Sequence, residues 1–113
     1  MFSGKKCTLV FQPHLFTRTR DFANDFAEVL DLADEVYLLP IYPAREKPIE
    51  GVTSSMLSDK MTKAITKVVD KQEVLEILKR KESENQLEML VTAGAGDIDT
   101  LVEPIRKIIE NKK

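Results

Sequence analysis

The feature that most constrains the fold is an alternation of short apolar runs with longer amphipathic segments. Four apolar runs predict strands over residues 7–12, 35–40, 67–69 and 87–94. Apolar residues at helical spacing predict helices over residues 17–33, from Ser54 or Ser55 to about residue 65, and over residues 70–81 and 97–113. Such a pattern is typical of a parallel sheet covered on both sides. We therefore expect an α/β fold, with one domain over residues 1–113 and an open, mostly parallel sheet with helices on both faces.

The bulk composition narrows the classes of function. The chain has 113 residues and a net charge of -2, so it lacks the basic field that binds nucleic acid. Its apolar runs are far shorter than the ~20 residues of a membrane span, and no signal-peptide pattern opens the sequence. We therefore expect a cytoplasmic protein without nucleic-acid or membrane partners. Cys7, its one cysteine, lies in an apolar run and is predicted to be a buried, inert thiol.

Three of the four predicted strands end in unusual loops, and open α/β sheets bind ligands outside the carboxyl ends of their strands. In the first loop, "PHLFTRTR", Thr17 or Thr19 is a candidate N-cap that places Arg18 and Arg20 on or beside the first helical turn. A cation there is unfavourable by roughly 0.3–1 kcal/mol because the helix dipole is positive at this end. A bound carboxylate or phosphate, held by backbone amides and a guanidinium, would remove the conflict.

Two interpretations of these arginines remain open. Either they help to bind an anion, or Asp21 and Asp25 neutralise them at the surface. His14, the only histidine, is likewise either a ligand-contacting residue or a structural hydrogen-bonding group.

The second loop covers residues 41–53 and has two prolines, a glycine and no periodicity. Connections of this length without secondary structure are uncommon in compact domains and tend to be functional or mobile. Tyr42, Arg45 and Glu46 are its candidate functional residues. The alternative is an ordinary solvated loop in which the charged residues serve no ligand.

The third loop is "AGAGD", residues 93–97. Gly94 and Gly96 allow positive φ and close backbone approach, as nucleotide-binding turns need, and Asp97 is a candidate N-cap of the last helix. The full dinucleotide fingerprint would need a further glycine at Asp99, so a Rossmann cofactor site is disfavoured. The sequence also lacks a phosphate-loop motif for ATP and a G-x-S-x-G elbow, and its single histidine and single cysteine allow neither a triad nor a zinc site.

Pro104 conflicts with the last predicted helix. Inside a helix it would remove the hydrogen bond to Thr100 and cost ~3 kcal/mol, so we expect a kink or an irregular first turn there.

The segments "FQPHLFTRTRDFANDFAEVL", "YPAREKPIEGVTS" and "AGAGDID" together resemble the C-terminal domain of the Mur ligases, with the order and spacing of that family from about Cys7 to Ile109. The resemblance is closest to the members that join L-alanine to UDP-N-acetylmuramate in peptidoglycan biosynthesis. It implies a three-domain enzyme, in which an N-terminal domain binds the UDP-sugar and a central domain binds most of the ATP and Mg²⁺. The implied reaction passes through an acyl phosphate.

The resemblance also assigns roles to residues of the three loops. His14 and Arg18 match the L-alanine site, with Arg18 as the partner of the alanine carboxylate, and Gly94, Ala95, Gly96 and Asp97 match a turn on the nucleotide side. Two departures bear on these roles. Leu15 stands where several members have arginine, which leaves Arg18 to carry more of the charge, and Asp97 replaces an asparagine and adds a charge.

Nothing in the sequence matches the "D-x-x-H-H-P" loop and the helix that precede the "FQPH" strand in this family. We therefore expect a Rossmann-like domain that lacks its first strand and helix and has no ligase activity by itself. Two alternatives remain: a related Mur ligase with another amino acid or a peptide as acceptor, and a stand-alone α/β module that binds small anions.

Overall fold

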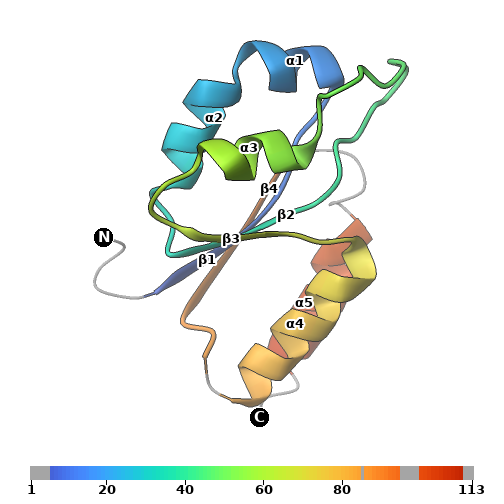
Figure 1. Cartoon of the computed structure of the whole chain (residues 1–113). Coiled ribbons are helices and arrows are strands. Elements are labelled where there is room, and N and C mark those ends of the chain that lie inside the picture. Colours follow the sequence, from blue (N-terminus) through green and yellow to red (C-terminus); the bar gives the residue numbers. More distant parts are fainter. Residues whose placement is uncertain (1–5, 85, 95–99, 111–113) are drawn as a thin grey trace.

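The computed structural model describes residues 6–84, 86–94 and 100–110 of the chain. Strands and helices alternate along it, as the sequence pattern predicts (Figure 1). In chain order the elements are β1 (Cys7–Gln12), α1 (Phe16–Asp21), α2 (Ala23–Leu30), β2 (Glu35–Leu38), α3 (Ser54–Lys60), β3 (Ile65–Val68), α4 (Lys71–Ser83), β4 (Met89–Gly94) and α5 (Val102–Glu110).

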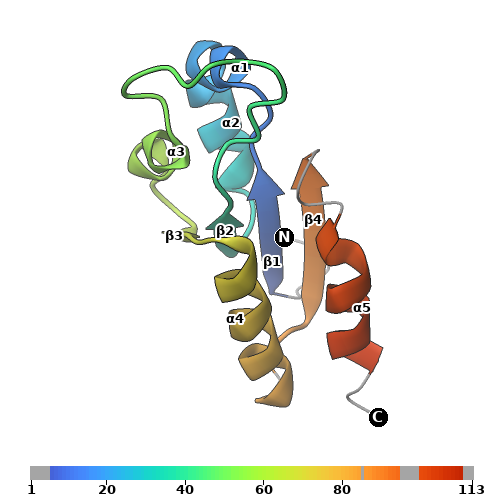
Figure 2. The same cartoon turned by 90° about the vertical axis from the view of Figure 1, so that its right-hand side faces the viewer.

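The four strands form one parallel sheet in the order β3-β2-β1-β4. The chain runs outward from β1 to β2 and β3, and then returns to the other side of β1 as β4 (Figure 2). This reversal makes the gap between the carboxyl ends of β1 and β4 a topological switch point, where α/β sheets bind ligands. The predicted α/β class and the common edge for the strand ends are confirmed.

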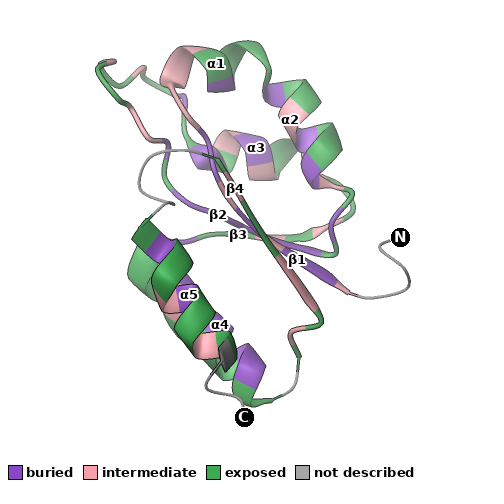
Figure 3. Ribbon diagram, turned by 180° about the vertical axis from the view of Figure 1, so that it is seen from behind, coloured by how far each residue is buried: buried purple, intermediate pink, exposed green. Residues whose placement is uncertain are grey.

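Helices cover both faces of the sheet. Helices α1, α2 and α3 lie on one face, and α4 and α5 lie on the other (Figures 1 and 2). Alternate residues of the central strands contribute to two cores, one on each face of the sheet. Figure 3 shows that the central strand β2 is buried along its length. Val10, Tyr37 and Leu39 pack toward α4 and α5, whereas Val36 and Leu38 pack toward α2 and α3.

The edge strands are less buried than the sequence pattern predicts. In β3, Ile65 is 69% exposed and Val68 is 37% exposed, and in β4 Val91 is 39% exposed. The two central strands are more buried, since all four residues of β2 are buried and no residue of β1 is exposed. Apolar composition alone cannot distinguish a central strand from an edge strand.

The single helix predicted over residues 17–33 is two helices. α1 ends at Asp21, and Phe22 (φ -116°, ψ 22°) connects it to α2. Phe22 is 51% exposed and Val29 is 64% exposed, although helical spacing places both on the buried face. The buried face of α2 consists instead of small residues and one leucine: Ala23, Ala27 and Leu30.

The helix that begins at Ser54 ends at Lys60, earlier than predicted, and β3 begins at Ile65. Asp31, just beyond α2, is the cause. Its carboxylate accepts hydrogen bonds from the amides of Thr62 (2.9 Å), Lys63 (3.1 Å) and Ala64 (3.1 Å), which therefore cannot continue the helix. Burial opposes the charged form, but these hydrogen bonds lower the pKa of Asp31.

The starts of α4 and α5 confirm one local prediction and part of another. Asp70 caps α4 through a hydrogen bond from the amide of Glu73 (2.8 Å), as predicted. Pro104 does not break α5, because the helix begins at Val102 after a 3₁₀ turn at Thr100 and Leu101. A proline in the first turn removes no helical hydrogen bond, so the expected cost does not arise and only the irregular first turn is confirmed.

The amino edge of the sheet is held by polar contacts. Glu35 is 6% exposed and forms ion pairs with Lys81 (3.1 Å) and Lys6 (3.2 Å). Cys7, nearby on β1, is buried as predicted, and its burial raises the pKa of the thiol. These contacts lie at the opposite end of the strands from the three unusual loops.

Candidate functional site

The carboxyl edge of the sheet brings together the first two loops predicted from the sequence. The chain continues past β1 and β2 in a parallel bridge between His14 and Tyr42. In this bridge the amide of Tyr42 donates to the carbonyl of Pro13 (2.8 Å), and the amide of Leu15 donates to the carbonyl of Tyr42 (2.9 Å). The rings of His14 and Tyr42 stack with their centroids 5.8 Å apart and an angle of 13° between the planes. His14 is therefore held in a structural contact as well as being placed at the candidate site.

The third loop joins the same edge through Gly94, which pairs with Gln12 across β1 and β4. Gly94 has φ +119°, and a Cβ atom built there would lie 2.3 Å from the carbonyl oxygen of Gln12. Glycine is therefore required here by the approach of the protein's own β1 backbone. The other candidate residues of this loop, Ala95, Gly96 and Asp97, lie outside the described residues.

The start of α1 differs from the expectation. The helix begins at Phe16, and the residue in the N-cap position is Leu15, with φ 71° and no capping side chain, so neither Thr17 nor Thr19 is the N-cap. Thr19 is instead buried, with its hydroxyl donating to the carbonyl of Leu15 (2.8 Å). A positive φ in a leucine is a strained conformation, which its neighbours must hold in place.

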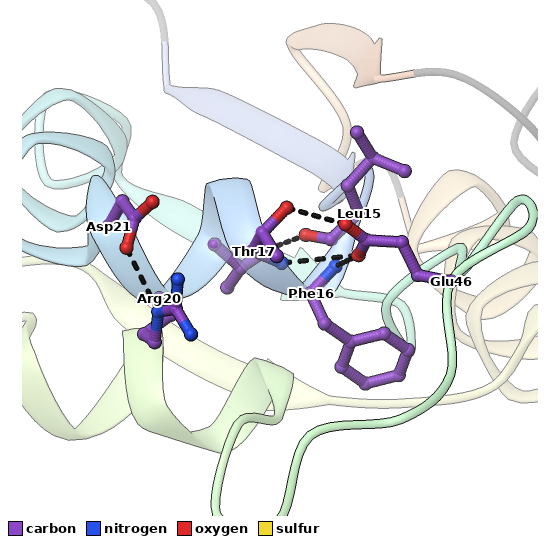
Figure 4. Close-up of polar contacts among 7 residues, drawn as sticks. Leu15, Phe16, Thr17, Arg20, Asp21 and Glu46 are labelled. Atoms are coloured by element: carbon purple, nitrogen blue, oxygen red, sulfur yellow. Dashed lines mark hydrogen bonds and ion pairs between the residues drawn. The ribbon is translucent and has the colours of Figure 1, made fainter.

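A side chain from the second loop caps α1. The Glu46 carboxylate accepts hydrogen bonds from the amides of Phe16 (2.6 Å) and Thr17 (3.2 Å) and from the hydroxyl of Thr17 (2.5 Å) (Figure 4). The hydroxyl bond from Thr17, the two amide bonds and the charge of Arg20 lower the pKa of Glu46. The expectation that these amides are free to bind a substrate carboxylate is therefore wrong for this structure.

The two arginines of α1 are in different situations. Arg20 forms an ion pair with Asp21 (2.9 Å), and the hydrogen bond to Asp21 raises the pKa of Arg20. This contact bears out the alternative of surface neutralisation for Arg20 (Figure 4). Arg18 is exposed, and it makes no ion pair or side-chain hydrogen bond with any other residue that the structure describes. Its guanidinium is thus available to an anionic ligand.

Arg45 lies in the turn of the second loop that the hydrogen bond from Glu46 to Pro43 closes, and it is exposed. Within the ranges of residues described above, it has no hydrogen-bonding or ion-pair partner. Among the three candidates of this loop, the structure therefore gives defined contacts to Tyr42 and Glu46 but not to Arg45.

Sequence reasoning missed two contributors to this edge. The buried side chain of Gln12 donates from Nε2 to the carbonyl of Pro40 (3.1 Å), which ties β1 to the segment after β2. The capping role of Glu46 was also missed, because it lies about thirty residues from the helix that it caps. A glutamine at the end of an apolar run can be recognised in the sequence as a candidate for a buried polar contact. In contrast, nothing in the local sequence indicates that Glu46 caps α1.

The described helices include none that is long and apolar enough to cross a membrane.

No protein-family model matches the chain. Curated proteins do match it. The UDP-N-acetylmuramate–L-alanine ligase of Phocaeicola vulgatus is 50% identical over 113 residues, which cover 99% of this chain and 24% of that protein. Proteins of the same name from Parabacteroides distasonis and Flavobacterium johnsoniae are 48% and 50% identical over 109 residues, covering 96% of this chain and 23% of each protein.

The chain thus spans about a quarter of the length of the curated relatives that it matches. The similarity includes the loops that meet at the carboxyl edge, since nearly every residue of the chain is aligned. Over almost all of its length, this chain is similar to part of the UDP-N-acetylmuramate–L-alanine ligases of these bacteria.

Proposed function

We propose that this chain is part of an ATP-dependent ligase that joins L-alanine to UDP-N-acetylmuramate, and that it supplies the amino-acid site. The observation that carries the proposal is the identity of about half of the residues with ligases of this name, along nearly the whole chain. The meeting of the first two loops at the carboxyl edge supports it, because this is where an α/β sheet binds small ligands.

In this proposal Arg18 holds the carboxylate of L-alanine. Its guanidinium is exposed and unpaired among the described residues, and guanidinium groups bind carboxylates through charge-assisted hydrogen bonds. His14 lies four residues before Arg18 on the same edge, where its stacking on Tyr42 fixes the ring beside the proposed place of the amino acid. The amides of α1 take no part, since Glu46 occupies them.

The remaining chemistry belongs to other parts of the enzyme. ATP would supply the phosphoryl group that activates the sugar-linked carboxylate, and the amine of L-alanine would then displace phosphate to form the amide. The proposal assigns Mg²⁺ and most contacts to ATP to other domains of the enzyme, and Gly94, Ala95, Gly96 and Asp97 to the nucleotide side of the cleft. Because the reaction would consume ATP, we place it in the cytoplasm.

The test joins this segment to the upstream domains and measures phosphate release. We expect release to depend on both UDP-N-acetylmuramate and L-alanine, while the 113-residue chain alone is inactive. Glycine, serine and a tripeptide serve as competing acceptors in the same assay. Preference for one of these over L-alanine would replace the proposal with a ligase for another acceptor. Specific binding of L-alanine or ATP by the isolated chain, together with a ligase assay that stays silent, would point to a stand-alone anion-binding module.

A further inference from the structure

Among the described residues, Glu46 is the carboxylate at the carboxyl edge with the most hydrogen bonds, and the proposed chemistry does not use it. Its two oxygens accept three hydrogen bonds from Phe16 and Thr17, on a segment about thirty residues earlier in the chain (Figure 4). Glu46 itself is fixed by a turn, in which its amide donates to the carbonyl of Pro43 (2.9 Å) and Ala44 takes φ 53°.

The segment that Glu46 bonds has no cap of its own. Leu15 occupies the N-cap position without a side-chain hydrogen bond and with a positive φ, so the first amides of α1 depend on a distant acceptor. The backbone bridge of Tyr42 to Pro13 and Leu15 fixes one point of the second loop, and Glu46 fixes a second point four residues further on. Two separate attachments hold the loop against the start of α1.

From this geometry we propose that Glu46 is a positioning residue, which clamps the second loop to α1 and thereby sets Arg18 and His14 for the amino acid. Arg18 follows the clamped residue Thr17 directly, and His14 lies just before Leu15. Loss of the clamp releases both the helix start and the loop beside it. The role in amino-acid binding rests on the proposed function, whereas the clamp itself does not.

The first measurement is made on the 113-residue chain by NMR. Glu46→Ala should shift the amide resonances of Phe16 and Thr17 and speed their hydrogen exchange several-fold, because their acceptor is lost. Glu50→Ala is the matched control, since Glu50 is an exposed glutamate of the same loop whose side chain makes no hydrogen bond or ion pair among the described residues. Thr17→Val removes one donor and keeps the size of the side chain, so it tests the contact without removing the carboxylate. Unchanged exchange at Phe16 and Thr17 in Glu46→Ala would overturn the clamp.

The second measurement uses the ligase that contains this segment. Glu46→Ala should raise KM for L-alanine several-fold and leave KM for ATP and for the UDP-sugar unchanged, and Glu46→Gln should recover part of the loss because its amide oxygen can still accept. Glu50→Ala should behave as wild type. Faster exchange combined with an unchanged KM for L-alanine would refute the positioning role. An enzyme that never uses L-alanine would refute the proposed function, and the exchange measurement would still decide the clamp.

Discussion

The contact between Gly94 and Gln12 gives a prediction with a matched control in the same chain. A Cβ atom at Gly94 would lie 2.3 Å from the carbonyl oxygen of Gln12, whereas carbon–oxygen contacts lie at about 3.3 Å or more. That oxygen is backbone of the central strand β1, and the Gln12 side chain is tied to Pro40, so it cannot move away cheaply. Gly51 also has a positive φ, of +81°, but nothing lies within 4 Å of a Cβ there.

The two substitutions separate backbone strain from steric clash. Gly51→Ala should cost about 1–2 kcal/mol, from the left-handed backbone alone. Gly94→Ala combines strain of about 1–3 kcal/mol with a clash of about 1–3 kcal/mol, which sums to about 2–6 kcal/mol. A domain of this size has about 5–15 kcal/mol of stability, so the second loss is a large fraction of the total.

Urea unfolding followed by far-ultraviolet circular dichroism measures both losses of free energy on the same scale. The account predicts a clearly larger loss for Gly94→Ala than for Gly51→Ala. Equal losses would show that β1 and β4 do not approach each other as closely as the structure has them. The close approach of the β1 backbone would then not be the reason that position 94 requires glycine.

The other predictions concern the ion pairs at the amino edge. Lys81→Met should cost about 3 kcal/mol in the same unfolding assay, because it leaves the buried carboxylate of Glu35 with only the partly exposed Lys6; a loss within error of zero would contradict the pairing. Acid should also destabilise the chain. Burial opposes ionisation of Glu35, but the hydrogen bond from Lys81 and the nearby charges of Lys81 and Lys6 hold its pKa below the ordinary value of 4.5. Its contribution is therefore complete above pH 4.5 and is lost as the pH falls through the lower folded-state pKa; Glu35→Gln should make stability less dependent on pH in that range.

Local signals in the sequence predicted much of the fold. The limits of β1 follow from an apolar run closed by Pro13, and α4 follows from the cap at Asp70, since both depend on residues close together in the chain. The common edge of the loops follows from parallel strands alone. The same reasoning placed His14 and Tyr42 at one edge, and the structure joins them in one bridge.

The errors come from contacts between distant residues. Asp31 ends α3 early by bonding Thr62 and its neighbours, and Glu46 caps α1 in place of Thr17 or Thr19. Neither contact leaves a pattern in the local sequence, because a carboxylate can serve any group of amides that the fold brings to it. The sequence correctly indicated an excess of positive charge on α1. In the structure, however, the carboxylate that binds the first amides of α1 is that of Glu46, from the protein itself.

The central claim is that Arg18 binds the carboxylate of L-alanine, and the KM for L-alanine of an Arg18→Ala ligase tests it most directly. Losing a charge-assisted contact worth about 1.5–3 kcal/mol should raise this KM roughly 10- to 150-fold. Arg80→Ala, which removes an exposed arginine on α4 near the opposite edge, should leave it unchanged. An Arg18→Ala enzyme that binds L-alanine as tightly as wild type would contradict the account.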